Sequence, residues 1–391
     1  MHDDQERELR FGRRALLTGG IGGTGLLAAA VVQAREPQRL PRITASDWPG
    51  RAKAIRRAWL DMIGPFPSEK RGLDLEMRRI DDIEGIECHY LTFRSESDDR
   101  VPAYLLVPKD ARPGPSPALV CPHPTSAGAG KAQCVGLTGK APEDPPLPPG
   151  ESRAYGLELA RWGYVTISID LFGDGERIPE GYSRYDSEPF YKRHPKWSMF
   201  GKNAWDCMRA VDVLETLDSV DSKRIGCIGH SLGGHTSLCA AAFDERIAVA
   251  LSNCGKLGWV RDTDHWARPQ DPASKRGPVN DYCYIPNFAP YITDTTAPVP
   301  CDFDGLMMLV APRPLMIQAS EGEFKEQGTV ERVLQAQEVY HALGAGDRVG
   351  MFSFPGEHNF PPVAKRFGFA WLDRWLDHTP AVPTIWPGQA V

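Results

Sequence analysis

Short apolar runs alternate along this chain with segments of helical periodicity. Two stretches rich in β-forming residues, 86–96 and 100–108, are separated by polar residues and predict an antiparallel hairpin. Further strands, buried by their apolar composition, are predicted at 117–121, 164–170, 224–230, 247–254, 314–320 and 348–354. Helical spacing is found at 154–163, 203–217, 235–243 and 366–376. This alternation indicates a mostly parallel sheet with helices on both faces.

The strand predicted at 224–230 ends in a G-x-S-x-G pattern centred on Ser231. Ligands of such sheets bind at the carboxyl ends of the strands, so residues at these ends are candidates for chemistry. A serine on a sharp strand-to-helix turn needs small neighbours, which Gly229 and Gly233 provide, and the helix that follows points free N–H groups at it. The pattern predicts Ser231 as a nucleophile. A glycine turn with an exposed hydroxyl is the alternative.

A serine nucleophile requires a base, and an acid that orients the base. His358 lies in a glycine- and proline-rich loop directly after the last predicted strand. The acid is expected after the strand 314–320, where "SEGEFKE" contains Glu321, Glu323 and Glu326. We predict Glu323, because the loop needs a few residues to turn back toward the histidine, with Glu321 as second choice. The alternative is that all three are solvated charges.

The backbone of two segments is expected to bind the oxyanion of the reaction. One donor should be the N–H of Leu232, directly after the serine. The other should come from the loop after the strand 117–121, where Pro124 has no N–H, so Thr125 is the first usable donor and Ser126 the next.

Two insertions, at about 171–202 and 255–300, interrupt the alternation with many aromatic residues. We expect the second to form a lid over the serine, with His123, Trp259 and Tyr284 lining the substrate pocket. Packing of the loops against each other is an equally good explanation of these aromatics. Arg177 and Arg261 are candidates for binding an anionic group of the substrate.

The first 34 residues have the features of a twin-arginine export signal. Arg13-Arg14 precede a weakly apolar, glycine-rich run that ends at a site suited to cleavage after Ala34. We therefore expect export to the periplasm or the medium, with an uncleaved anchor in the inner membrane as the alternative. The rest, 35–391, is expected to form one domain with a helical lead-in over 35–72. No other segment is expected to cross a membrane.

Composition narrows the possible partners. A net charge of −6 without a basic stripe gives no support for nucleic-acid binding. Neither an H-E-x-x-H pattern nor a Cys/His zinc spacing occurs, so we expect no metal and no organic cofactor. The chain has nine cysteines, an odd number. Whether Cys283 and Cys301 pair, and which oligomeric state the protein adopts, cannot be derived from these patterns.

With these residues identified, the chain resembles the α/β-hydrolase superfamily, and within it the bacterial dienelactone-hydrolase-like and acetyl-xylan-esterase-like serine esterases. The segments that carry the resemblance are "VPAYLLVP", "AWDCMRAVDVLETLDSVDSKRIGCIGHSLGG", "DFDGLMMLVAPRPLMI" and "PGEH". It implies an α/β-hydrolase fold with lid insertions and a Ser-acid-His triad. Three positions depart from the usual pattern. The acid is Glu instead of Asp, His123 is followed by Pro124 instead of Gly, and Leu232 stands where glucuronoyl esterases have Arg.

The resemblance implies an exported hydrolase of carboxylic esters, acting on a small-molecule or carbohydrate ester, including acetyl esters of carbohydrates. Two other functions are compatible with the same residues. One is a prolyl-oligopeptidase-like peptidase, although the chain has no room for the large upstream domain usual in those enzymes. The other is a binding protein that kept the fold and lost catalysis.

Overall fold

The computed structural model describes residues 43–109, 114–126, 128–137, 153–259, 266–267, 283–294 and 296–381. The predicted export signal and Arg261 lie outside these ranges. The described residues fall within one compact unit that spans 42–391. Among them, no helix combines the length and apolarity that a membrane span requires.

A nine-stranded sheet forms the centre of the fold, in the order β1-β2-β3-β5-β4-β6-β7-β8-β9. Its strands are β1 (Glu76–Arg79), β2 (Glu87–Glu96), β3 (Asp99–Val107), β4 (Ser116–Val120), β5 (Val165–Ile169), β6 (Val220–His230), β7 (Ile247–Asn253), β8 (Leu315–Ser320) and β9 (Val349–Phe354). The strands from β5 and β4 through β9 pair in parallel, while β1, β2 and β3 add an antiparallel edge. The predicted class, a mostly parallel sheet flanked by helices, is confirmed, as is the antiparallel hairpin.

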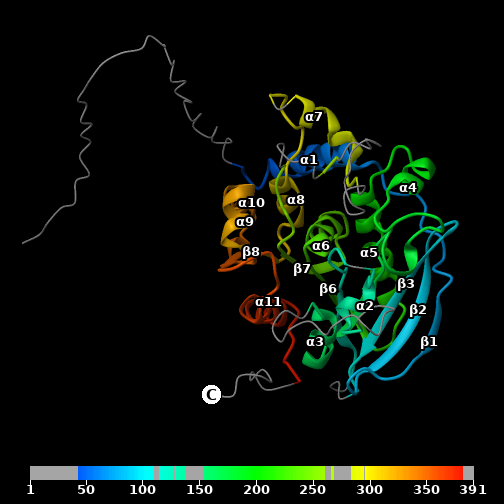
Figure 1. Ribbon diagram of the computed structural model, residues 1–391. Coiled ribbons are helices and arrows are strands. Elements are labelled where there is room, and N and C mark those ends of the chain that lie inside the picture. The colour runs from blue at the N-terminus through cyan, green and yellow to red at the C-terminus, as the bar shows by residue number, and fades with distance from the viewer. Residues whose placement is uncertain are drawn as a thin grey trace, which may run out of the picture. The chain divides into compact units, whose positions relative to one another are not determined.

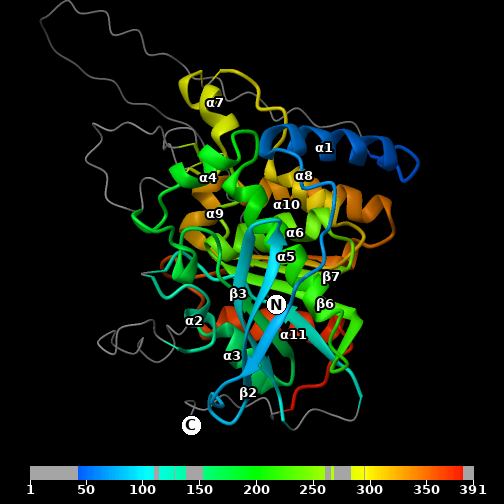
Figure 2. The same ribbon diagram turned by 90° about the vertical axis from the view of Figure 1, so that its right-hand side faces the viewer.

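Helices cover both faces of the sheet (Figures 1 and 2). They are α1 (Trp48–Ile63), α2 (Lys131–Cys134), α3 (Tyr155–Trp162), α4 (Glu188–Arg193), α5 (Met199–Leu214), α6 (Leu232–Phe243), α7 (Ala289–Thr293), α8 (Phe303–Val310), α9 (Glu321–Gln327), α10 (Thr329–Ala342) and α11 (Pro362–Trp375). α5 and α6 pack on one face, with α8, α10 and α1 outside them, and α2, α3 and α11 pack on the other. The strands in the middle of the sheet are buried on both sides and consist mostly of apolar residues, as their sequences predict.

The segment after β8 differs from the prediction. We expected a loop around the candidate acids, but the chain enters α9 at Glu321, directly after the strand. Glu321 and Glu323 occupy the first turn of this helix, where carboxylates interact favourably with unpaired N–H groups. The same charges that look like those of a solvated loop in sequence therefore suit the start of a helix.

The two cysteines left open by the sequence, Cys283 and Cys301, are both buried and do not form a disulfide with each other. Cys301 lies directly before α8, and burial raises the pKa of its thiol to about 12, so it is neutral at physiological pH.

Candidate active site

The turn between β6 and α6 places Ser231 in a strained backbone conformation. Its φ of 56° and ψ of −119° lie in a region that residues with side chains rarely adopt. Both flanking glycines are needed, because a Cβ on Gly229 would collide with the carbonyl of Gly233, and one on Gly233 with the carbonyl of Pro122. The turn therefore projects the serine side chain from the carboxyl edge of the sheet, beside the loop that follows β4.

Ser231, His358 and Glu323 form one hydrogen-bonded chain. Nε2 of His358 lies 2.8 Å from Oγ of Ser231, and its Nδ1 lies 2.7 Å from Oε1 of Glu323. Because an ionised carboxylate can only accept, Nδ1–H donates to Glu323, which leaves Nε2 free to accept the serine O–H. The His358 side chain is 43% exposed and that of Glu323 15% exposed. His358, the base that can take the serine proton, is thus accessible to solvent, and the more buried Glu323 fixes its orientation.

The environment of Glu323 keeps this acid ionised. Burial by itself would raise the pKa of the carboxyl group, but the hydrogen bond to His358 and the proximity of its charge lower the pKa to about 2. Oε2 also accepts a hydrogen bond of 3.3 Å from the Ser320 hydroxyl. Glu321 is exposed and makes no hydrogen bond to His358 among the described contacts. The side chain of Glu326 lies outside the described residues. The geometry thus favours Glu323 over Glu321 as the acid of the triad.

The two expected oxyanion donors have backbone N–H groups without a backbone acceptor among the described residues. Leu232 is the first residue of α6. Thr125 lies in the loop 122–126, which the backbone of α6 approaches closely at Gly233. The next amide along, that of Ser126, donates to the hydroxyl of Tyr185 at 2.6 Å. Thr125 is therefore the donor in this loop that remains available.

Of the three pocket residues expected from the sequence, His123 and Tyr284 are buried in the interior and Trp259 is half-buried. His123 is fully buried, with Nδ1–H donating to Pro124 and Nε2 accepting from the amide of Leu171. Trp259 stacks on Phe288 with a centroid distance of 4.4 Å. Tyr284 is buried edge-on against the ring of His235.

The aromatic composition of the described part of the second insertion thus reflects packing against the domain. The prediction of a pocket wall is wrong for His123 and Tyr284, whose side chains are covered by their neighbours, whereas for the half-buried Trp259 it stays a prediction. Of the insertion, residues 260–265, 268–282 and 295 lie outside the described ranges.

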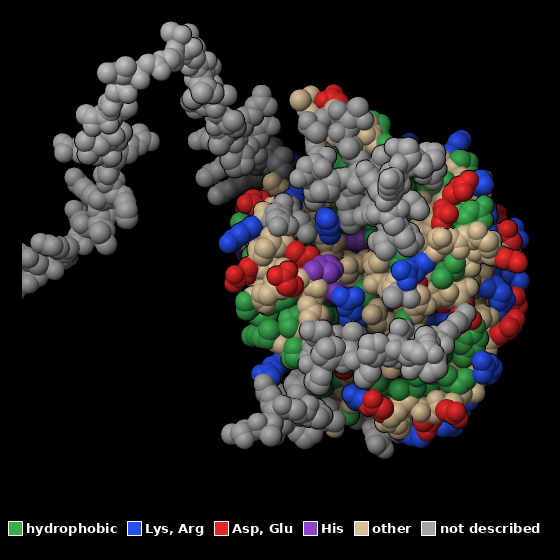
Figure 3. Space-filling view, viewed as in Figure 1, with side chains coloured by type: hydrophobic (Ala, Val, Ile, Leu, Met, Phe, Trp, Pro, Cys, Tyr) green, Lys and Arg blue, Asp and Glu red, His purple; other side chains and the backbone are tan. Residues whose placement is uncertain are grey.

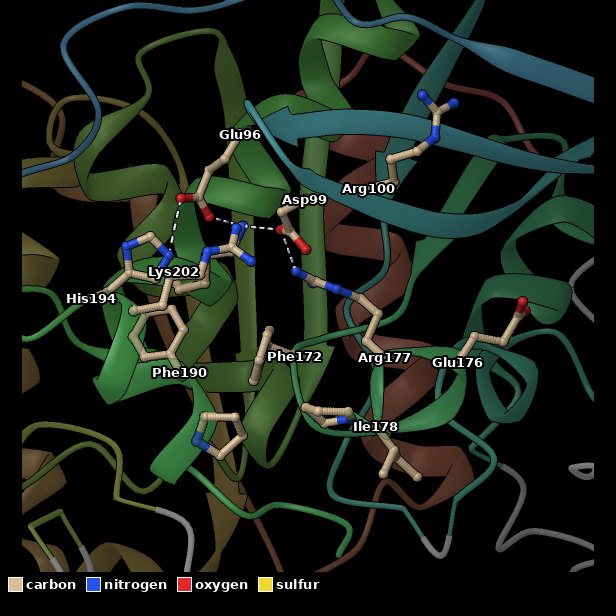
Figure 4. A pocket seen from close by; sticks show the side chains of 13 residues that line it. Glu96, Asp99, Arg100, Phe172, Glu176, Arg177, Ile178, Phe190, His194 and Lys202 are labelled. Carbon is tan, nitrogen blue, oxygen red and sulfur yellow. Dashed lines mark hydrogen bonds and ion pairs between the residues drawn. The ribbon is translucent and has the colours of Figure 1, made fainter. Parts of the chain in front are cut away.

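Arg177, expected as a possible ligand for an anion, is neutralised by the protein. Its guanidinium donates to Asp206 and Asp99, each at 2.7 Å, and Lys202 bridges the same two carboxylates. Figure 4 shows Arg177, Asp99 and Lys202 of this cluster, together with Glu96, at the wall of a cleft between the β2–β3 hairpin and the first insertion. The cluster connects the insertion to the sheet and neutralises the charge of Arg177 within the protein, while the buried Nε–H of Arg177 has no hydrogen-bond partner among the described residues.

A buried polar chain lies beneath the triad, and the sequence analysis missed it. Nδ1–H of His230 donates to Oδ1 of Asn253 at 2.6 Å, and the Nδ2 group of Asn253 lies 3.5 Å from Oε1 of Gln318. Gln318 in turn donates to the carbonyl of Ala364 in α11. Burial and the nearby charge of His358 hold the pKa of His230 well below its usual value, so the ring is neutral. The available signal was a polar residue at or near the end of three neighbouring, mostly apolar strands.

One cluster of described residues has the donor types of a metal site. Ligand atoms of Cys254, Glu323 and His358 all lie within 4.8 Å of one another. Two of these are the members of the hydrogen-bonded chain, and burial raises the pKa of the Cys254 thiol. A thiol that remains protonated is a poor ligand, so the arrangement fits a triad with a buried neighbour better than a metal centre.

The chain is similar to several known proteins. Residues 180–344 match the family described as "Glucuronyl esterase, fungi". YtaP of Bacillus subtilis, named as a hydrolase, is 25% identical over 329 residues, which cover 82% of this chain and 98% of YtaP. Carbohydrate esterase MZ0003, from an unknown prokaryotic organism, is 30% identical over 50% of this chain and 44% of its own length.

The solved structures show the same fold. A glucuronoyl esterase from Solibacter usitatus superimposes with a TM-score of 0.63 and 19% identity, covering 85% of this chain and 94% of the esterase. Together with the sequence matches, this likeness confirms the predicted resemblance to serine esterases of the α/β-hydrolase superfamily.

Proposed function

We propose that this α/β-hydrolase-fold serine esterase hydrolyses carboxylic esters of carbohydrates through an acyl-enzyme formed on Ser231. One observation carries the proposal: a strained serine at the end of β6 shares a continuous hydrogen-bonded chain with His358 and Glu323. The same three residue types in this arrangement perform acyl transfer on unrelated folds, so the geometry, and not the fold alone, supports the chemistry.

In the acylation step, Oγ of Ser231 attacks the ester carbonyl while its proton passes to Nε2 of His358. Glu323 stabilises the resulting imidazolium through Nδ1–H, and the N–H groups of Leu232 and Thr125 bind the oxyanion. Collapse of the tetrahedral intermediate breaks the bond to the alcohol, which leaves with the proton from His358. Water then gives its proton to the same histidine, attacks the acyl-enzyme and releases the carboxylic acid, and the proton returns to Ser231.

The carbohydrate part of the proposal draws on the relatives, whose names describe carbohydrate esterases. Two kinds of ester are possible on a sugar, an acetyl group on a hydroxyl and an alkyl group on a uronic acid. In glucuronoyl esterases the sequence resemblance places an arginine at position 232. This chain has a buried leucine there, so it offers no guanidinium at this position. We therefore propose acetyl esters as the preferred substrates.

The test compares wild type and Ser231→Ala on acetylated xylan oligomers and on a methyl ester of glucuronic acid, with p-nitrophenyl acetate as a general probe. Loss of all three activities in the variant supports the nucleophile, and a higher kcat/KM on the acetylated oligomers supports the substrate class. Ser237→Ala is a matched control, because this buried serine lies in α6 and bonds only the carbonyl of Gly233. Activity retained by Ser231→Ala would show that the mechanism is wrong.

Two other functions give different results in the same set of assays. A peptidase would cleave a panel of peptides with larger kcat/KM than the acetyl esters. A binding protein without catalysis would fold normally but leave Ser231 unlabelled by a fluorophosphonate. Since the described triad is complete and correctly ordered, we expect labelling at Ser231 and slow or absent peptide cleavage.

We also propose that the protein is exported through the twin-arginine route. The support is the order of the arginine pair, apolar run and cleavage-like site within residues 1–34. A double substitution Arg13→Lys, Arg14→Lys should retain the protein in the cytoplasm of a bacterial host, as followed by fractionation. Unchanged export of this variant would contradict the proposal.

A further inference from the structure

The central sheet ends in two strands of opposite character. β1, at one edge, has four residues, of which Glu76, Arg78 and Arg79 are charged and all are exposed. β9, at the other edge, is six residues long and reads Val-Gly-Met-Phe-Ser-Phe, without a charge or a proline. Natural sheets protect free edges with short, charged strands, because an uncharged edge pairs with other chains. β1 has this protection and β9 does not.

The surface around β9 is apolar on both sides of the sheet. Met351 is 42% exposed, next to α9 and α10. On the other face, Phe352 stacks on Phe367 of α11 with a centroid distance of 4.4 Å, and Phe367 is itself 53% exposed. Val363 of α11 is exposed as well. Figure 3 shows hydrophobic side chains gathered on this flank of the molecule, over α11.

The backbone of β9 is bonded on one side only. All six residues pair with β8, and no other backbone hydrogen bond of 349–354 occurs within the described part of the chain. The outer edge of the strand therefore presents unpaired N–H and C=O groups between two apolar strips. This is the combination used when one sheet is extended by a strand from another chain.

We propose that β9 pairs in antiparallel fashion with β9 of a second copy of this chain, about a two-fold axis that passes between the two copies of Met351. In this register Met351 lies opposite Met351 of the second copy, and Val349 lies opposite Ser353. The two-fold also brings the start of each strand, where Arg348 is exposed, to the end of the other, where Glu357 is exposed. The patch is thus complementary to itself in backbone direction and in charge, which is what a two-fold interface requires.

A different partner would not need this symmetry. A strand of any protein could pair with β9. When the partner is a second β9, however, both copies contribute Met351, Phe352 and Phe367 to the interface. The dimer would contain one continuous sheet of eighteen strands, twice the nine of one copy. Apolar side chains would be buried at the interface on both faces of this sheet, which stabilises the dimer. Ser231 follows β6, three strands away from this edge, whereas His358 follows β9 by four residues, so the interface lies on the side of the active site that carries the base.

The experiment is sedimentation equilibrium of wild type, Met351→Lys and Met77→Lys. Met77 is the matched control, because it is 44% exposed on β1, the opposite edge strand. We expect wild type and Met77→Lys to form a dimer with the same dissociation constant. In Met351→Lys the constant should rise at least about tenfold, since two lysines would meet across the axis. Hydrolysis of p-nitrophenyl acetate should be equal in all three, which confirms that the variants fold.

Arg348→Glu gives an independent measurement. Placing like charges opposite Glu357 should weaken the dimer, and raised salt should reduce the difference between this variant and wild type. A wild-type protein that remains monomeric at the highest soluble concentration would overturn the proposal. So would a dimer that Met351→Lys and Met77→Lys weaken to the same extent, because the β9 edge would then have no special role.

Discussion

The substitution Glu323→Gln tests the acid of the triad at its most specific point. It keeps the size of the side chain and removes the charge that faces Nδ1 of His358. The interactions of the carboxylate lower its pKa from 4.5 to about 2. A difference of this size corresponds to roughly 3 kcal/mol. Because His358 is partly exposed, water screens part of this energy, and we take about 2 kcal/mol as the share that stabilises the imidazolium.

The energy by which Glu323 stabilises the imidazolium sets a lower bound on the decrease in kcat. A loss of about 2 kcal/mol in the transition state lowers kcat roughly 30-fold. The glutamine amide can also donate to Nδ1, which would place the imidazole proton on Nε2, where it blocks acceptance of the serine proton. In a serine protease the equivalent acid-to-amide change costs about 10⁴ in kcat. We therefore expect kcat to fall by between about 30-fold and 10⁴-fold.

The assay is steady-state hydrolysis of p-nitrophenyl acetate at pH 7.5, with thermal unfolding as a check of integrity. Glu321→Gln is the matched control, since it makes the same chemical change two residues away in the first turn of α9. It should keep wild-type kcat. The assignment is refuted if Glu323→Gln remains within threefold of wild type, or if Glu321→Gln is the more damaging change.

Three further predictions concern the scaffold around the site. Gly233→Ala should abolish activity and lower the free energy of unfolding by about 1–3 kcal/mol, because its Cβ would collide with the Pro122 carbonyl. Gly322→Ala, with open space around its Cβ, should change neither, and urea unfolding measures the stability of both variants. Burial and the neighbouring Asp302 raise the pKa of Asp304 to about 6, so the folded protein loses stability as pH rises from about 4 to 6. Asp304→Asn should therefore be more stable than wild type by up to about 3 kcal/mol at pH 7.5 and equal to it at pH 4. Lys202→Met should destabilise the protein by about 3–5 kcal/mol in urea unfolding, because Arg177 would then be the single cation among the described residues that faces the largely buried carboxylates of Asp99 and Asp206.

Features encoded by neighbouring residues could be predicted from the sequence. The antiparallel hairpin is revealed by two β-rich runs with polar residues between them, and the structure pairs them from Glu87 with Val107 onward. The strand-turn-helix around Ser231 is equally local, because the two glycines and the following helix all lie within a few positions. Such signals depend on backbone sterics and periodicity, which one short window of sequence contains.

Features that depend on contacts between distant residues could not be predicted. The aromatic residues Trp259 and Tyr284 suggested a pocket by composition, yet Trp259 packs against Trp59 of α1 and against Phe288, and Tyr284 packs against His235 of α6. Arg177 looked like an anion ligand because its partners, Asp99 and Asp206, lie 78 and 29 positions away. Whether a charged or aromatic side chain is available for a ligand is decided by what packs on it, and a single sequence does not show this.

The positions of the three triad residues follow from the alignment of four neighbouring parallel strands. Ser231 follows His230, which pairs with Asn253 of β7, and Asn253 pairs with Gln318 of β8. These same three side chains, His230, Asn253 and Gln318, form the buried polar chain beneath the site. A shift of β8 by one residue would move the start of α9 by about 3.3 Å and turn Gln318 to the other face of the sheet.

Such a shift would separate the acid from the histidine and break the polar chain at the same time. The alternative alignment would leave buried amide groups without partners, at a cost of about 1–3 kcal/mol for each group. Apolar strands such as β7 and β8 specify their neighbours weakly, because many alignments bury similar area. The polar residues at their ends distinguish one alignment from the others, and that alignment is the one in which the carboxylate of Glu323 meets Nδ1 of His358.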